Sequence, residues 1–207
     1  MGLRIAVMVS GGGTNMQTII DEIKNKNING SIEIVISSKD DAFALKRAEN
    51  CGIENICIGK KDFSDLEMRT KKIMEVLDKR KIDFIILAGY MSIIDKKIIE
   101  KYHNRIINIH PSLIPSFCGR GYYGAKVHEA VLEYGVKITG ATVHFVDEGT
   151  DTGPIILQEA VEVKPEDTVE TLAAKVLKVE HKLLPKAVKL FCEGRLHIEE
   201  RKVIIKG

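Results

Sequence analysis

Two polar residues separated by one position follow a hydrophobic run in the segment NIHPSLIPSF, which begins at Asn108. In an extended strand, alternate residues such as Asn108 and His110 point to the same side. An asparagine amide can donate a hydrogen bond to a carbonyl oxygen that gains negative charge, and a histidine can transfer a proton near neutral pH. Pro111 and Pro115 restrict the backbone that follows. This pattern suits the activation of a carbonyl, and equally a strand end whose polar groups only bind loop backbone.

An acidic loop could supply a partner for His110. The segment HFVDEGTDTGP carries Asp147, Glu148 and Asp151 directly after a strand pattern. A carboxylate next to a histidine favours the protonated imidazole and raises its pKa. These carboxylates could also be solvated turn residues, and the residues alone do not say which one would contact His110. His144, within the strand pattern, is expected to be a hydrogen-bonded structural residue.

A glycine-rich segment, SGGGTN at residues 10–15, lies between a strand pattern and a helical pattern. Free backbone N–H groups and the helix dipole favour an anion at such a position, most often phosphate. The segment is no Walker loop, because no Gly-Lys-Ser/Thr follows, and Met16 replaces the third glycine of a dinucleotide fingerprint. We therefore expect a phosphate site; the alternative is a tight turn that binds nothing.

The composition excludes several classes of protein. The chain has 207 residues, 44% of them hydrophobic, and a net charge of +2, so one sizeable core is expected and no global field favours nucleic acid. No hydrophobic run has transmembrane length. Four scattered cysteines and the remaining histidines show no ligand spacing, so we expect no metal and reduced thiols in the cytoplasm. The basic runs KNKN, KRAEN and DKRK are interpreted as solvated helix ends.

Strand and helix patterns alternate through the first half of the chain. Strands joined by crossover helices form a parallel, doubly wound sheet, in which ligands bind beyond the carboxyl ends of the strands. This rule selects residues 10–15, residues 89–94 and the stretch from Asn108. Ser64 and Glu67 are spaced as a capping box at the start of the third helix. The expected strands are LRIAVMV, IEIVISS, ENICI, IDFIILAG and RIINI.

The second half changes character. VKITGATVHFVD and IILQEAVEV alternate and are rich in β-branched residues, which predicts antiparallel strands. A long helical pattern follows, in which Pro185 predicts a kink or break, and LHIEERKVIIKG predicts a hairpin or two edge strands. We predict an α/β fold with a doubly wound, mostly parallel sheet, helices on both faces and an antiparallel C-terminal extension, in a single domain of residues 1–207.

Five separated motifs occur in order along nearly the whole chain: SGGGTN, LAGYM, NIHPSLIPSF, TGATVHFVDEGTDTGPIILQ and KVEHKLLP. Together they resemble the phosphoribosylglycinamide formyltransferase family. The resemblance implies the formyltransferase fold and transfer of a formyl group from 10-formyltetrahydrofolate to the amine of glycinamide ribonucleotide in purine biosynthesis. It implies these two small molecules as partners, without metal, nucleic acid or membrane, for a cytoplasmic monomer or homodimer.

The resemblance also implies roles for individual residues. Asn108, His110 and Asp151 would be catalytic: the amine attacks directly, Asn108 and protonated His110 stabilise the tetrahedral oxyanion, and Asp151 keeps His110 charged and helps to move the proton. The choice of Asp151 comes from the resemblance, because the residues alone left three carboxylates open.

Two binding sites are implied in the same way. Gly13, Thr14 and Asn15 would bind the ribonucleotide phosphate, and Glu180 would hold the ribose hydroxyls. The implied folate-binding residues are Met91, Ser92, Ile93, Ile94, Asn108, Asp147, Glu148, Gly149, Thr150 and Asp151.

Three features depart from the common family pattern. Ser92 stands where an arginine is common, and Leu66 stands at the spacing of another folate-contacting arginine, with Lys60, Lys61 and Arg69 nearby. That arginine contact is left unassigned. The segment CGRGYYG, residues 118–124, is longer than usual; a mobile flap over the substrates is one hypothesis, and a plain surface loop is the alternative.

Three other functions are the alternatives. A formyltetrahydrofolate hydrolase would use water as the acceptor, but that family carries an additional N-terminal domain, and this chain begins at the first strand. A methionyl-tRNA formyltransferase would need a further C-terminal domain to bind RNA, which neither length nor charge indicates. A nucleotide-binding or regulatory protein would use only SGGGTN and would turn over no formyl-folate.

Overall fold

The computed structural model describes residues 2–207, which form two compact units. The first ends at Ile107 and the second comprises Asn108–Gly207. Strand β5 (Ile106–His110) crosses the boundary between them. The single domain expected over residues 1–207 therefore stays a prediction.

The first unit contains the parallel part of the sheet, with the strand order β3-β2-β1-β4-β5. Strand β1 (Leu3–Val9) pairs in parallel with β2 (Gly30–Ser37) and β4 (Phe84–Leu87), and β2 pairs in parallel with β3 (Asn55–Cys57). The side chains of β4 are all buried, as its continuous hydrophobic sequence predicts for a strand covered on both faces.

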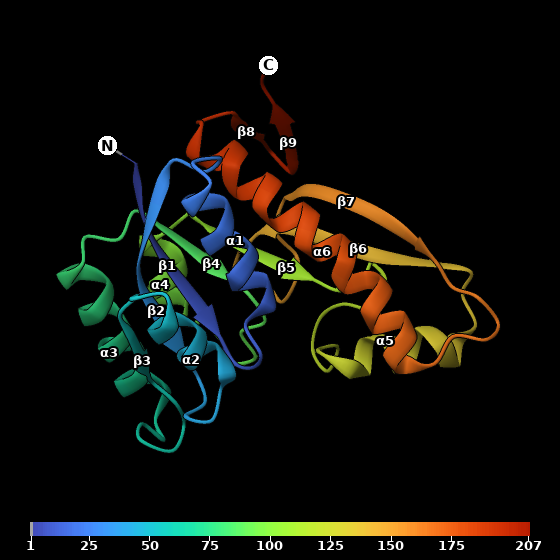
Figure 1. The fold of residues 1–207 in the computed structure, drawn as a ribbon, viewed down its shortest axis with the longest axis horizontal. Coiled ribbons are helices and arrows are strands. Elements are labelled where there is room, and N and C mark those ends of the chain that lie inside the picture. Colours follow the sequence, from blue (N-terminus) through green and yellow to red (C-terminus); the bar gives the residue numbers. More distant parts are fainter. Residues whose placement is uncertain (1) are drawn as a thin grey trace. The chain divides into compact units, whose positions relative to one another are not determined.

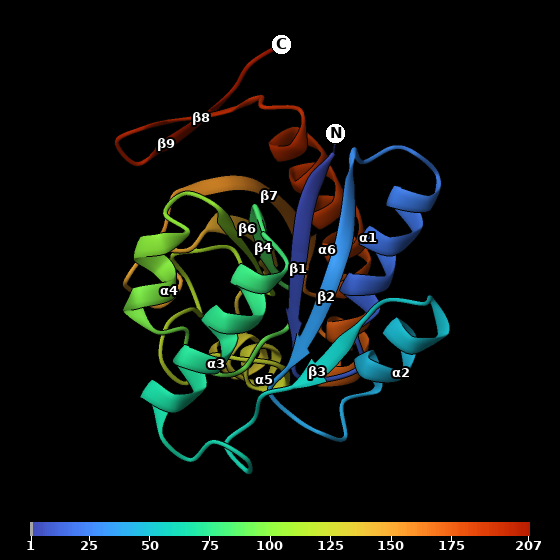
Figure 2. The ribbon, with the colours of Figure 1, turned by 90° about the vertical axis from the view of Figure 1, so that its left-hand side faces the viewer.

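Four helices cover the two faces of this part of the sheet. In Figure 2, α1 (Thr14–Lys24) and α2 (Phe43–Asn50) lie on one side of β1–β3, and α3 (Leu66–Lys79) and α4 (Lys96–Lys101) lie on the other. Each long helix buries one face; in α1 the buried hydrophobic residues have the expected helical spacing. The doubly wound arrangement is therefore confirmed.

The second unit contains the antiparallel extension, with the order β5-β6-β7-β9-β8. Strand β6 (Ile138–Phe145) is antiparallel to β7 (Ile155–Glu162), and β8 (Leu196–Glu199) is antiparallel to β9 (Lys202–Ile205). Strands β7 and β9 pair in parallel. The helices are α5 (Ala125–Tyr134) and α6 (Val169–Cys192), and α6 packs across β6 and β7 (Figure 1).

Of the two outcomes predicted at Pro185, a break is wrong, because α6 continues through the proline to Cys192. A kink there stays a prediction. Pro185 is itself buried with the hydrophobic face of the helix. Buried packing on both sides of the proline, at Leu184 and Ala187 among others, stabilises helical geometry where the local rule favours an end.

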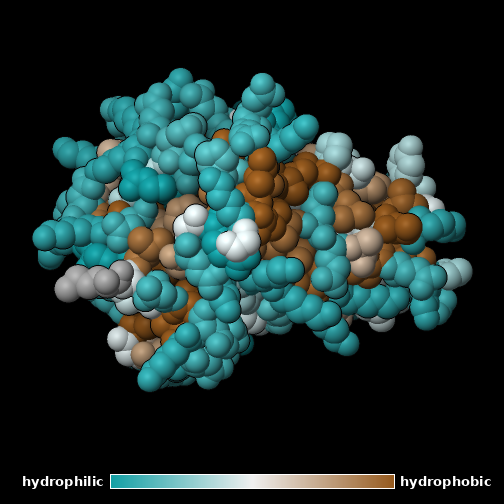
Figure 3. All heavy atoms as spheres, turned by 90° about the horizontal axis from the view of Figure 1, so that it is seen from above, coloured by the Kyte–Doolittle hydropathy of each residue, from teal (hydrophilic) through white to brown (hydrophobic). Residues whose placement is uncertain are grey.

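The hydrophilic residues cover most of the face drawn in Figure 3, with smaller patches of hydrophobic atoms between them. Among the described residues, no helix has both the length and the hydrophobicity needed to cross a membrane.

The start of α3 also differs from its prediction. Asp65, not Ser64, is the N-cap, and its carboxylate accepts a hydrogen bond of 3.2 Å from the Met68 N–H. An N-cap side chain satisfies a helix N–H group that has no partner within the helix.

Asp65→Ala should therefore lower the free energy of unfolding by about 1 kcal/mol, measured by urea denaturation. Ser64→Ala is the matched control and should stay within about 0.5 kcal/mol of the wild type. The reverse ranking would show that the predicted capping box, and not Asp65, caps the helix.

Candidate active site

A cluster of polar side chains lies at the end of β5 in the second unit. Asn108 and His110 leave β5 on the same side, as their spacing predicts, and Asp151 reaches them from the loop after β6. Asp151 Oδ2 lies 3.6 Å from His110 Nδ1, and Asp151 Oδ1 accepts a 3.4 Å hydrogen bond from Asn108 Nδ2. The three residues that the resemblance implied as catalytic therefore meet at one place.

The structure adds His144, from β6, to this cluster. His144 Nδ1 is 2.8 Å from the carbonyl oxygen of Phe145, so a proton is assigned to Nδ1. Nε2 lies within hydrogen-bonding distance of Asn108 Nδ2, at 3.1 Å. His144 is thus hydrogen-bonded in its strand, as expected, and it also orients the Asn108 amide. Its position at the carboxyl end of a strand was the sequence signal for this second role.

The His110 ring is held at both nitrogens and is only 4% exposed. Nε2 lies 2.9 Å from the Phe117 carbonyl oxygen, which is compatible with a donated hydrogen bond, and Nδ1 faces Asp151. Burial lowers the pKa of His110, and this effect outweighs the opposing attraction of the Asp151 carboxylate. The free protein therefore favours a neutral His110 at neutral pH, in contrast to the protonated form that the resemblance implied.

Asp151 stays ionised in this buried place. Burial would raise the pKa of its carboxyl, but contact with His144, the His110 ring and the Gly119 N–H together bring it below its usual value. The Gly119 N–H donates to Asp151 Oδ2 at 3.0 Å. The backbone of Asp151 has a φ of 58°, in the left-handed region that non-glycine residues seldom occupy. An unusual backbone thus directs a charged group towards two histidines.

The other carboxylates of this loop have different surroundings. Asp147 accepts hydrogen bonds from the Gly149 N–H and from the Thr152 hydroxyl within its own loop. Glu148 and Thr150 are exposed. The geometry therefore places Asp151 beside His110, whereas Asp147 is a turn-forming residue.

The segment at residues 118–124 is attached to the same cluster. The Gly119 N–H donates a hydrogen bond to Asp151. The ring of Tyr122 packs edge-on against the ring of Phe117, with 6.2 Å between the ring centroids. Phe117, whose carbonyl binds His110, has a φ of 49°. The position of His110 therefore depends on this segment, and whether the segment moves over bound substrates stays a hypothesis.

The glycine loop of the first unit has the geometry of an anion site. Gly13 has a φ of 73° and precedes α1, and no described side chain caps this helix. A Cβ at Gly13 would lie 2.6 Å from the Ala44 Cβ, whereas at Gly11 and Gly12 it would meet open space. The first N–H groups of α1 are therefore presented beside an open loop, as phosphate binding requires.

Several hydrogen bonds hold this loop. Ser10 Oγ accepts a 2.8 Å hydrogen bond from the Met91 N–H, which connects the loop to the segment at residues 91–94. Arg47 Nε donates to the Gly12 carbonyl oxygen at 2.8 Å. Arg47 thereby adds positive charge beside the loop. Sequence reasoning missed this role because KRAEN had the composition of a solvated helix end.

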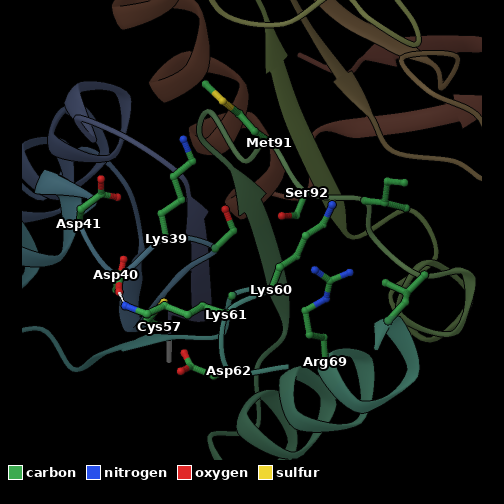
Figure 4. Close-up of a pocket in the computed structure, with 14 residues that line it drawn as sticks. Lys39, Asp40, Asp41, Cys57, Lys60, Lys61, Asp62, Arg69, Met91 and Ser92 are labelled. Carbon is green, nitrogen blue, oxygen red and sulfur yellow. Dashed lines mark hydrogen bonds and ion pairs between the residues drawn. The ribbon is translucent and has the colours of Figure 1, made fainter. Parts of the chain in front are cut away.

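A separate cavity of about 690 Å³ lies within the first unit (Figure 4). Three of the four implied folate-binding residues at 91–94 line it: Met91, Ser92 and Ile93. Arg69, from α3, also lines this cavity, and its side chain is buried, with 7% exposed. Glu180, implied for the ribose, lies on α6 in the second unit and is buried. No group of side chains that could hold a metal ion occurs among residues 2–207.

Comparisons with known proteins agree with this geometry. Residues 3–188 match the model of the formyl transferase family. Phosphoribosylglycinamide formyltransferase of Haemophilus influenzae is 38% identical over 204 residues, which are 99% of this chain and 94% of that protein. The chloroplastic phosphoribosylglycinamide formyltransferase of Vigna unguiculata is 40% identical over 193 residues, which are 93% of this chain and 62% of that protein.

The solved structures give the same result for the fold. Glycinamide ribonucleotide transformylase 1 from Symbiobacterium toebii has a TM-score of 0.94 to this chain at 41% identity, covering 100% of this chain and 95% of that one. The α/β formyltransferase fold predicted from the sequence is confirmed by this similarity. The chain belongs to the formyl transferase family.

Proposed function

We propose that the protein transfers the formyl group of 10-formyltetrahydrofolate to the amine of glycinamide ribonucleotide in purine biosynthesis. The observation that carries this proposal is the meeting of Asn108, His110 and Asp151 at the end of β5, in a chain of this family. Small-molecule substrates suffice for the reaction. A cytoplasmic location, a monomer or homodimer, and the absence of nucleic-acid and membrane partners belong to the same proposal.

Substrate binding is assigned to three groups of residues. The N–H groups at Gly13, Thr14 and Asn15 would bind the ribonucleotide phosphate, supported by the dipole of α1. Glu180 would accept hydrogen bonds from the ribose hydroxyls. The folate-binding residues remain those that the resemblance implied, and the cavity lined by Met91, Ser92 and Ile93 supports part of that assignment.

The carbonyl oxygen of the formyl group would be stabilised by the Asn108 amide. One Nδ2 hydrogen is directed to His144 at 3.1 Å, and the other makes a long contact of 3.4 Å with Asp151. The long contact is weak by hydrogen-bond geometry, so this second hydrogen is the one that can turn to an oxyanion. A donor of this kind contributes on the order of 3 kcal/mol to transition-state stabilisation.

Proton transfer is assigned to the His110–Asp151 pair. As the amine nitrogen forms its bond to the formyl carbon, it loses a proton, and the neutral His110 can accept it. The Asp151 carboxylate stabilises the imidazolium that forms. When the bond from the formyl carbon to the folate nitrogen breaks, the same proton passes to that nitrogen. His110 therefore begins and ends the cycle neutral.

The activity itself is tested by following tetrahydrofolate release from 10-formyltetrahydrofolate with and without glycinamide ribonucleotide. Release that requires the ribonucleotide is expected for the transferase. Release without it would identify a hydrolase, and no release in either mixture would identify a binding protein; either result would overturn the proposal.

Asp151→Asn should lower kcat by about 10²- to 10⁴-fold, because the imidazolium loses its counter-charge. The KM for glycinamide ribonucleotide should change little, since Asp151 is not assigned to phosphate or ribose binding. Steady-state kinetics on both substrates measures this. Glu166→Gln, which removes an exposed carboxylate of the same unit, is the control and should keep wild-type rates. Near-wild-type turnover by Asp151→Asn would exclude the proton-transfer role.

The pKa of His110 provides a pH test. Because burial lowers this pKa, NMR titration of the free enzyme should place it below the usual 6.5. The base is active when neutral, so kcat/KM should rise with pH through this pKa and then level off. In Asp151→Asn the carboxylate that opposes the effect of burial is lost, so the pKa of His110 should fall further. A higher pKa in the variant would contradict the assigned electrostatics.

A further inference from the structure

The three consecutive glycines at residues 11–13 make the glycine loop conformationally free. None of them has a Cβ that restricts φ and ψ, so each peptide group in this stretch could turn over. Binding of an anion through backbone N–H groups requires these peptide groups to be held in one orientation before the ligand arrives. The contacts that fix them therefore determine how well the loop can bind phosphate.

Helix α2 fixes two of these peptide groups through their carbonyl oxygens. The Gly11 carbonyl oxygen accepts a hydrogen bond of 3.0 Å from the Ala44 N–H. The Gly12 carbonyl oxygen accepts one of 2.8 Å from Arg47 Nε. Both donors belong to α2, which lies on the same side of the sheet as α1 (Figure 2). Two successive carbonyl groups of the loop thus point to α2.

The N–H groups of the loop must then point away from α2. In a planar trans peptide the C=O and the following N–H point in opposite directions. Because the carbonyls of Gly11 and Gly12 face α2, the N–H groups of Gly12 and Gly13 are turned to the other side. Among residues 2–207, no group accepts a hydrogen bond from either of these two N–H groups. The Gly13 carbonyl accepts the first bond of α1, from the Gln17 N–H at 3.0 Å.

The backbone conformation gives these donors a concave arrangement. Gly13 is left-handed, with φ 73° and ψ 25°, and the right-handed helix α1 begins at Thr14. Successive N–H groups at a junction of this kind form an anion-binding concavity. A Cβ at Gly11 or Gly12 would meet open space, and Gly12 is exposed. The donors therefore face a region that a ligand can enter.

Arg47 is the side chain among the three donors that hold the loop carbonyls. The other two are backbone N–H groups within helices, whose positions follow from helical geometry. The Arg47 side chain is long and needs support of its own, which the ring of Phe43 supplies: the guanidinium carbon lies 5.1 Å from the ring centroid. The nearby acid Glu49 pairs with Lys46 at 2.8 Å. Arg47 is therefore held over the loop by Phe43 and Gly12.

We infer that Arg47 is a positioning residue for the phosphate loop. By binding the Gly12 carbonyl, it keeps the Gly13 N–H turned to the ribonucleotide phosphate, and the Gly12 N–H becomes an additional donor to that phosphate. Arg47 acts through the peptide group and lies on the side opposite to the anion. This inference rests on the assignment of glycinamide ribonucleotide under the proposed function and adds two residues, Arg47 and Gly12, to the binding of its phosphate.

Steady-state kinetics is the first part of the test. Arg47→Gln should raise the KM for glycinamide ribonucleotide on the order of 10-fold, as expected for one charge-assisted hydrogen bond. The kcat and the KM for 10-formyltetrahydrofolate should stay close to wild type, because binding is lost equally in the ground state and the transition state. Lys46→Gln removes the same charge one position earlier, where the side chain pairs with Glu49. It is the matched control and should keep the wild-type KM.

An NMR titration with inorganic phosphate is the second part and needs no turnover. In the wild type, phosphate should shift the amide resonances of Gly12 and Gly13. In Arg47→Gln the peptide group between them can turn over, so both resonances should be broadened before phosphate is added. The Kd for phosphate should rise by the same factor as the KM for the ribonucleotide.

Four results would overturn the inference. An unchanged KM with unchanged amide resonances in Arg47→Gln would show that the loop keeps its geometry without Arg47. An equal rise of KM in Lys46→Gln would assign the effect to net charge. A rise of both KM values together with a lower Tm would identify a structural arginine, and wild-type amides that do not respond to phosphate would place the anion elsewhere.

Failure of the proposed function has a different signature. A wild type whose Gly12 and Gly13 amides respond to phosphate, but which shows no turnover that depends on the ribonucleotide, would overturn the proposed function. Normal wild-type turnover with an unaffected Arg47→Gln would overturn the inference alone.

Discussion

The arrangement of the second unit depends on keeping one carboxylate charged while it is largely buried. Asp151 satisfies this constraint through the Gly119 N–H, the contacts with His110 and His144, and the amide of Asn108. These contacts come from three parts of the unit: β5, β6 and the segment after Phe117. The packing of these parts therefore determines the electrostatics of the candidate active site, and a shift of any one would weaken the stabilisation of a buried charge.

The backbone contributes as much as the side chains to this arrangement. Phe117 and Asp151 both adopt a positive φ. The carbonyl oxygen of Phe117 points to His110 Nε2, and the carboxylate of Asp151 points to His110 Nδ1. Such conformations persist only where the surrounding structure stabilises them, and they concentrate at functional sites. A buried neutral imidazole between an acceptor and an anion is well placed to take up a proton and to return it.

The two units treat buried charge in opposite ways. In the second, the protein itself supplies the partners of Asp151. In the first, the Arg69 guanidinium retains a buried N–H without a protein acceptor, next to hydrophobic walls and an open cavity. Because its partners are already in place, the Asp151 carboxylate has a defined position and stays ionised before a substrate binds, which suits electrostatic stabilisation of a transition state.

The sequence by itself determined the alternation of strands and helices, the glycine loop before α1 and the common side of Asn108 and His110, because these follow from local periodicity and backbone preference. Tertiary structure decided which carboxylate meets His110, that burial lowers the pKa of His110, and that Arg69 lacks a partner. It also decided that α6 continues through Pro185. These properties depend on burial and on distances between residues far apart in the chain, and a local pattern contains neither.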